Sequence, residues 1–141
     1  LLRFAFEGID FIDRPVELGL GRTLDLHCSY TRDQVLTGLG YYTEHRMPDV
    51  REGVKYLEGI KLDIFFITLN KSDKDYSPTT LYEDYSISDT RFHWQSQSTT
   101  SEQSQTGQRY IHHQSRGGKV ALFVREDKKD KAGACLVAGR L

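Results

Sequence analysis

Alternating hydrophobic and polar residues predict a chain built mainly of short β-strands. The clearest pattern lies in residues 62–69, LDIFFITL, where hydrophobic side chains point to both faces of one strand. Leu62, Ile64 and Phe66 share one face, while Phe65 and Ile67 lie on the other. Because both faces are apolar, we expect this strand to lie centrally in a sheet or to line a closed barrel.

Further segments carry weaker signals of the same kind. Residues 24–30 alternate apolar with polar side chains, as a half-buried strand does, and residues 119–125 repeat the pattern strongly. We therefore expect strands over residues 24–30, 53–57, 91–97, 108–112, 119–125 and 132–138.

One helix has a recognisable start. Thr31 followed three residues later by Gln34 is the pattern of a capping box, in which each side chain bonds the other residue's backbone N–H. The helix that follows would place Val35, Leu36 and Leu39 on one side and end at residue 38 or 40, which are glycines. Many short strands with one or two short helices indicate an α+β, mostly β fold, and we expect a small, mostly antiparallel β-barrel.

Length and composition indicate how many domains the chain contains. A chain of 141 residues is long enough for one domain with a real core. Residues 1–23 contain Pro15 and three glycines, and we interpret them as an N-terminal arm or a junction with a neighbouring domain, before a single domain over residues 24–141. Because the chain lacks an initial Met, we expect it to be excised from a longer protein.

Charge and cysteine content indicate a cellular location but do not identify a function. The net charge of −1 argues neither for nor against nucleic acid, so a DNA-binding protein of this composition must sort its charges onto separate faces. No apolar run approaches the roughly 18 residues of a membrane span, and no signal peptide is recognisable. Cys28 and Cys135 lack metal-site spacing, which favours two reduced thiols and a cytoplasmic location.

Candidate chemistry concentrates in residues 82–110, YEDYSISDTRFHWQSQSTTSEQSQTGQRY. This stretch holds the only Trp of the chain, an acidic pair, and many Ser, Thr and Gln residues. Aromatic rings supply flat apolar faces, and the polar side chains supply directional hydrogen bonds. Together they are suited to a pocket for a flat, polar, uncharged group such as a nucleobase.

The order of the residues adds a family resemblance. Residues 63–113, which include SPTTLYEDY, FHWQSQS and TGQRYI, followed by KVALFVRE, resemble a domain of uncharacterised function in bacterial restriction proteins. In those proteins the domain follows a phospholipase D-type nuclease and a superfamily 2 helicase motor. HCSYTRDQVLTGLG, from residue 27, resembles the entry strand and helix of that domain, so the resemblance covers roughly residues 24–126.

The resemblance implies a role as target reader in a modification-dependent, type IV-like restriction system. Readers of that class commonly have a PUA-like barrel, as in SRA and EVE modules, and flip a modified base into an aromatic pocket. We therefore expect a DNA-binding module that recognises 5-methylcytosine or a relative in duplex DNA, with nuclease or helicase domains as partners in the parent protein. The alternatives are an interaction domain that couples motor to nuclease without reading bases, and a binder of RNA or single strands.

Six residues are candidates for the base pocket. Trp94 would form a stacking wall, and Asp84 would accept a hydrogen bond from the cytosine N4 amino group, with Glu83 as second choice. A core Trp, a solvated acidic turn and a plain polar loop are the alternatives for the same residues. The candidate pocket consists of Tyr82, Asp84, Tyr85, Trp94, Ser96 and Gln97.

Basic and polar residues flanking this stretch are candidates for contacts to DNA phosphates. Each could equally be a solvated surface group. The set comprises Lys71, Lys74, Arg91, Thr99, Arg109 and Arg116.

We expect no catalysis, cofactor or metal in the isolated domain. The adjacent His112 and His113 would point to opposite faces of a strand, and neither they nor His93 have a Cys or acidic partner at ligand spacing. The sequence also lacks the paired acidic motif of nucleases and the zinc motif of deaminases.

Overall fold

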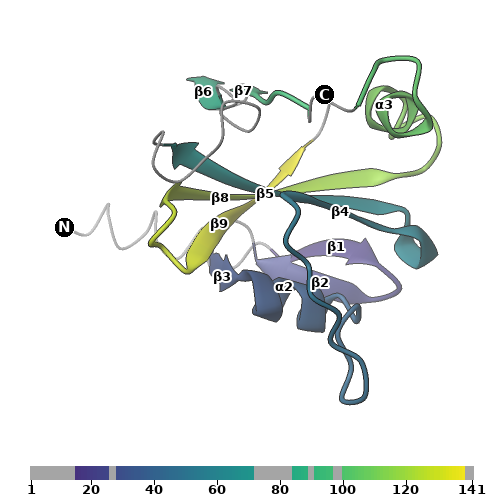
Figure 1. The fold of residues 1–141 in the computed structure, drawn as a ribbon. Helices are drawn as coiled ribbons and strands as arrows, with labels where there is room; N and C mark the ends of the chain where they lie inside the picture. The colour runs from purple at the N-terminus through teal and green to yellow at the C-terminus, as the bar shows by residue number, and fades with distance from the viewer. Residues whose placement is uncertain (1–14, 26–27, 72–83, 89–90, 97–99, 139–141) are drawn as a thin grey trace, which may run out of the picture.

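A computed structural model describes residues 15–25, 28–71, 84–88, 91–96 and 100–138 of the chain. Within them the fold is α+β and mainly strands, with one layer of structure on each face of a central sheet (Figure 1). In chain order the elements are β1 (Pro15–Gly19), β2 (Arg22–Asp25), β3 (Ser29–Thr31), α2 (Arg32–Gly38), β4 (Val54–Leu57), a 3-10 turn (Glu58–Ile60), β5 (Leu62–Asn70), β6 (Tyr85–Ser88), β7 (Arg91–His93), α3 (Gln105–Ile111), β8 (Lys119–Asp127) and β9 (Ala132–Ala138).

The central sheet contains five of the described strands in the order β3-β9-β8-β5-β4. β5 and β8 run parallel, with Phe65 opposite Leu122, and every other neighbouring pair in this sheet is antiparallel. β5 therefore lies between two strands and is covered on both faces, which accounts for its two apolar sides. The described sheets are open, so the closed barrel expected from the sequence is not seen in this part of the chain.

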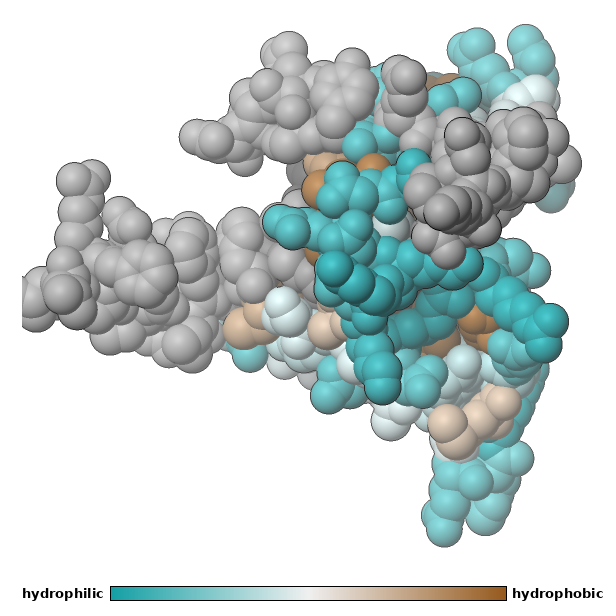
Figure 2. Space-filling model, turned by 60° about the vertical axis from the view of Figure 1, so that its left-hand side comes forward, coloured by the Kyte–Doolittle hydropathy of each residue, from teal (hydrophilic) through white to brown (hydrophobic). Residues whose placement is uncertain are grey.

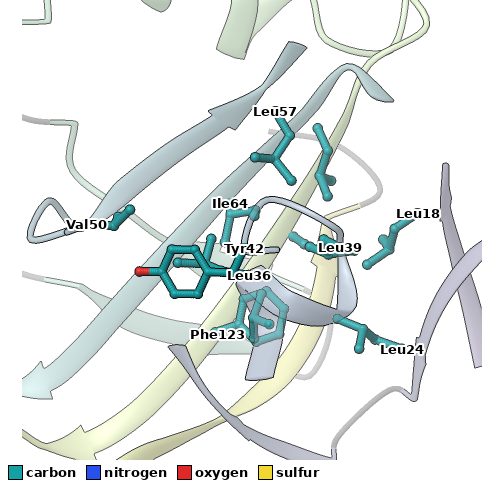
Figure 3. Close-up of a cluster of buried hydrophobic side chains, with 12 residues drawn as sticks. Leu18, Leu24, Leu36, Leu39, Tyr42, Val50, Leu57, Ile64 and Phe123 are labelled. Atoms are coloured by element: carbon teal, nitrogen blue, oxygen red, sulfur yellow. The ribbon is translucent and has the colours of Figure 1, made fainter. Parts of the chain in front are cut away.

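One face of the sheet, which we call the α2 face, carries a mainly aliphatic core (Figure 3). Helix α2 begins as predicted: the Thr31 hydroxyl accepts from the Gln34 N–H, and the Gln34 side chain accepts from the Thr31 N–H at 2.8 Å. The residues that bury this face are Leu18, Leu24, Val35, Leu36, Leu39, Tyr42, Val50, Leu57, Leu62, Ile64, Ala121 and Phe123.

The hairpin formed by β1 and β2 belongs to this same core. Leu18 is fully buried, and a Cβ added at residue 19 would lie 2.7 Å from Ile60 Cβ. Gly19 has φ +132°, a conformation that favours glycine, so the tight packing and the turn both depend on it. Within the segment interpreted as an arm, Val16 and Leu18 therefore pack with the core of the domain, and residues 1–14 lie outside the described residues.

Two sequence-based strand assignments are wrong. Residues 24–30 do not form one strand, because β2 pairs with β1 whereas β3 pairs with β9 in the central sheet. Residues 108–112 lie mostly in helix α3, whose N-cap Ser104 accepts from the Gly107 N–H at 3.0 Å. A Cβ at residue 107 would lie 2.2 Å from the Ser101 carbonyl oxygen, so a glycine inside this short helix permits close backbone packing.

The other strand predictions fare better. The strands expected at residues 62–69, 119–125 and 132–138 are confirmed as β5, β8 and β9. The strand expected over residues 91–97 is shorter, because β7 ends at His93. Within the described residues, no helix is long and apolar enough to cross a membrane.

Candidate functional site

The second face of the sheet, which we call the aromatic face, lies toward β6, β7 and α3 (Figure 1). It carries a stack of rings. The half-buried Trp94 lies on the buried Phe65, with ring centroids 4.1 Å apart and an interplanar angle of 19°. Tyr110 of α3 meets both rings edge-on, at 5.1 Å from Phe65 and 5.5 Å from Trp94. Such offset and edge contacts are the favoured arrangements of aromatic pairs. β5 therefore holds the indole through Phe65, and α3 holds it through Tyr110.

A buried ion pair lies beside this stack. Lys71 Nζ donates to Asp84 Oδ2 at 2.6 Å, and the two side chains are only 9% and 3% exposed. The other carboxylate oxygen, Asp84 Oδ1, accepts from the backbone N–H of Gln95 at 3.0 Å. Lys71 directly follows β5 and Asp84 directly precedes β6, so the pair links the end of β5 to the start of β6.

A second ion pair anchors α3 to the sheet. Arg109 donates from Nε and Nη2 to the Asp63 carboxylate of β5, at distances between 2.9 and 3.2 Å. The guanidinium also lies 4.0 Å from the centroid of the Tyr56 ring. Burial raises the pKa of the Asp63 carboxyl, and the Arg109 hydrogen bonds offset part of that rise. Burial likewise raises the pKa of Tyr110 to about 12.

His113 is buried at the end of this region. Its Nδ1 lies 2.9 Å from the Tyr110 carbonyl oxygen, whereas Nε2 has no hydrogen-bond partner among the described residues. Because a carbonyl only accepts, Nδ1 carries a proton and is the donor in this contact. Over the described ranges, no group of three His, Cys, Asp or Glu side chains could hold a metal ion.

The structure brings part of the candidate base pocket together. Asp84 bonds the backbone N–H of Gln95, the residue that follows Trp94. Ser96 Oγ donates to the Thr100 carbonyl oxygen at 3.4 Å, and Tyr85 lies in β6 opposite His93. Two further candidates for the pocket, Tyr82 and Gln97, lie outside the described residues, as does Glu83.

The candidates for phosphate contacts are dispersed. Lys71 and Arg109 each face a buried carboxylate, so their charges are neutralised inside the protein. Arg116 is exposed in the turn after α3, and Arg91 lies in β7. Lys74 and Thr99 lie outside the described residues. The phosphate contacts stay a prediction, in which Arg116 is the candidate that the structure describes as exposed.

Sequence reasoning missed the groups on which Trp94 rests. Phe65, Asp63 and Tyr110 were not assigned to the site, although Asp63 is the one charged residue in the apolar segment LDIFFITL. A charge in a strand buried on both faces needs a partner, and that signal could have pointed to a buried ion pair. Its partner, Arg109, is 46 residues away, which sequence patterning does not reveal.

Hydrophilic residues cover most of the described surface in the view of Figure 2, where hydrophobic residues are exposed only in small areas. Three large hydrophobic side chains of the described chain are exposed, and they belong to different segments. Leu20 lies in the β1–β2 turn, Met47 in the loop after α2, and Ile111 at the end of α3.

Comparison with known proteins gives one match. The sequence profile of a family described as Domain of unknown function (DUF3427) matches residues 24–135. No curated protein and no solved structure matches the chain.

Proposed function

The chain belongs to the DUF3427 family, and from this premise we propose that it is a DNA-binding module that reads modified cytosine in duplex DNA. The parent protein would be a modification-dependent restriction enzyme, with helicase and nuclease domains as its other parts. We further propose that the open sheet is the core of a PUA-like fold. The observation that carries the proposal is the half-buried Trp94, held on Phe65 and against Tyr110.

An aromatic ring fixed in this way is suited to receive a flipped base. Phe65 covers one face of the indole, and the exposed remainder of Trp94 would extend the stack by one more ring. Stacking on an aromatic side chain contributes about 1–3 kcal/mol per base, which offsets part of the few kcal/mol needed to unstack a base. A ring already held by two neighbours loses little side-chain entropy on binding, which further favours the bound state.

The remaining residues of the proposed pocket follow Trp94 or precede it closely in the sequence. Ser96 and Gln97 would contact base edges or the backbone, and Tyr82 and Tyr85 are the candidates for a second aromatic wall. A methyl group adds only on the order of 1 kcal/mol of burial, so strong discrimination requires a tight pocket. Arg116, Arg91, Lys74 and Thr99 are the proposed phosphate contacts, which makes binding weaken as salt rises.

A salt-titrated binding competition tests this proposal. Matched duplexes would carry cytosine, 5-methylcytosine or 5-hydroxymethylcytosine in several flanking contexts. We expect a preference of tenfold or more for one modified duplex, which corresponds to about 1.4 kcal/mol. Trp94→Ala should reduce the preference to near unity and Trp94→Phe should keep part of it, because Phe retains a smaller stacking face.

Met47→Ala is the matched control, because Met47 is an exposed apolar side chain in the loop after α2, and it should leave the preference unchanged. Equal binding to all duplexes would contradict base reading and leave a general DNA-binding role. Absence of binding to every duplex would contradict the proposal and favour a coupling role between motor and nuclease.

A further inference from the structure

The Lys71–Asp84 pair is an unusual way to stabilise a fold. Both side chains are almost completely buried, and removing two charges from water has a large desolvation cost that their attraction only partly returns. Apolar side chains of similar size would often stabilise such a position as well or better. What the pair adds over apolar packing is a fixed direction, because each carboxylate oxygen bonds one defined donor.

The direction that Asp84 fixes is that of the peptide bearing Trp94. Asp84 Oδ1 accepts from the Gln95 N–H, which belongs to the peptide unit joining Trp94 to Gln95. Because a peptide unit is planar and includes the Cα atoms on both sides, this bond orients the Cα that carries the indole. The opposite oxygen is held by Lys71, directly after β5, the strand that supplies Phe65.

We propose that Asp84 is a positioning residue, held by Lys71, that places the Trp94 indole on Phe65. In this proposal Asp84 does not accept from the N4 amino group of the base, because its side chain is only 3% exposed and its oxygens face Lys71 and the Gln95 N–H. The placement of the indole by Asp84 does not depend on DNA binding. The consequence for DNA rests on the proposed function, in which the same indole receives the base.

Three variants separate positioning from direct reading: Lys71→Met, Asp84→Asn and the double variant Lys71→Met/Asp84→Asn. Lys71→Met leaves a buried carboxylate without its counter-charge, whereas the double variant leaves a neutral amide whose oxygen can still accept from the Gln95 N–H. Trp94 is the only Trp of the chain, so the fluorescence emission of the protein reports on its surroundings directly.

Positioning predicts that Lys71→Met shifts the Trp94 emission to longer wavelength and lowers the preference for modified duplex at least fivefold. The double variant should restore the emission and regain most of the preference. Asp84→Asn alone should lie between them, because it keeps the bond to Gln95 while removing the carboxylate charge that Lys71 faces. Direct reading predicts instead that Lys71→Met keeps the preference and that the double variant is as poor as Asp84→Asn.

Lys119→Met is the matched control, because the Lys119–Glu17 pair has similar geometry, at 3.0 Å, but is exposed. It should change neither readout. An unchanged Trp94 emission in both folded Lys71→Met and folded Asp84→Asn would overturn the positioning role. If Lys71→Met does not fold, the double variant decides: native-like emission supports the proposal, and a red-shifted emission overturns it. If the wild-type chain prefers no duplex, the proposed function fails while the emission data still decide the positioning role.

Discussion

The two faces of the central sheet bury different chemistry. The α2 face is closed mainly by aliphatic side chains, such as Leu36 of the helix and Ile64 of the sheet. The aromatic face is closed by stacked rings and by two ion pairs, in which Asp63 and Asp84 are buried. Apolar burial stabilises a fold without specifying direction, whereas buried charges cost stability and fix geometry. We infer that the α2 face maintains the fold and that the aromatic face holds groups in position.

The sharpest test of this division is Leu36→Ala on the α2 face. Leu36 is fully buried, so its truncation should lower the free energy of unfolding by about 3–5 kcal/mol, as large-to-small core substitutions do. Chemical denaturation measures this loss, and Leu20→Ala at an exposed site is the control. The preference for modified over plain duplex should stay the same in the folded fraction. A changed preference would mean that the two faces are not separable.

Arg109→Met should have the next largest effect, on the aromatic face. It leaves the Asp63 carboxylate buried without a partner, which should cost about 3 kcal/mol, at the low end for a broken buried pair because the guanidinium side chain is 25% exposed. Unlike Leu36→Ala, it should also shift the Trp94 emission, since α3 carries Tyr110 against the indole. Denaturation followed by Trp94 fluorescence measures both. An unshifted emission in the folded variant would contradict the link through α3.

Tyr110→Phe sharpens the comparison at alkaline pH. Burial raises the pKa of Tyr110 from 10.0 to about 12, so between these values the unfolded chain loses the phenol proton before the folded chain does. The folded state then binds more protons, and the stability that Tyr110 supplies is complete below pH 10 and is lost as pH rises toward 12. The loss should reach about 2–3 kcal/mol. Urea midpoints from pH 9 to 11.5 should fall less steeply for Tyr110→Phe, and equal slopes would contradict the buried phenol.

The two helix caps provide the smallest contrast. Thr31 caps α2 and Ser104 caps α3, and each side chain accepts from a backbone N–H three residues later. Thr31→Ala and Ser104→Ala should each cost about 1 kcal/mol. Only Ser104→Ala should also shift the Trp94 emission, because only α3 touches the indole through Tyr110. Equal emission from the two variants would show that α3 does not restrain Trp94.

The α2 face could largely be predicted from the sequence, because its signals are local. The capping box is encoded by Thr31 and Gln34, and the buried side of the helix by the spacing of Val35, Leu36 and Leu39. The alternation in residues 62–69 and 119–125 identified β5 and β8 for the same reason. The pairing of strands was harder to predict, because no local pattern indicates that β5 and β8 run parallel. A hairpin and a helix lie between them in the chain.

The aromatic face could not be predicted in the same way, because its contacts join distant residues. Trp94 was identified as a candidate from composition, but its partner Phe65 lies much earlier in the chain, in β5. The acid chosen to read the base, Asp84, bonds Lys71 and the Gln95 backbone. A strand was predicted over residues 108–112, where the structure has helix α3. Glycine is a poor helix former, yet Gly107 in this helix permits close packing against the Ser101 carbonyl.

The central claim is that the Trp94 ring receives a modified base, and a fluorescence titration of the wild-type chain tests it most directly. Duplexes carrying 5-methylcytosine or cytosine at one position would be added while the Trp94 emission is followed, with Trp94→Phe as the blank. The account predicts quenching by the modified duplex at concentrations at least tenfold below those needed with plain duplex, because the base stacks on the indole. Binding of the modified duplex without any change in Trp94 emission would contradict it.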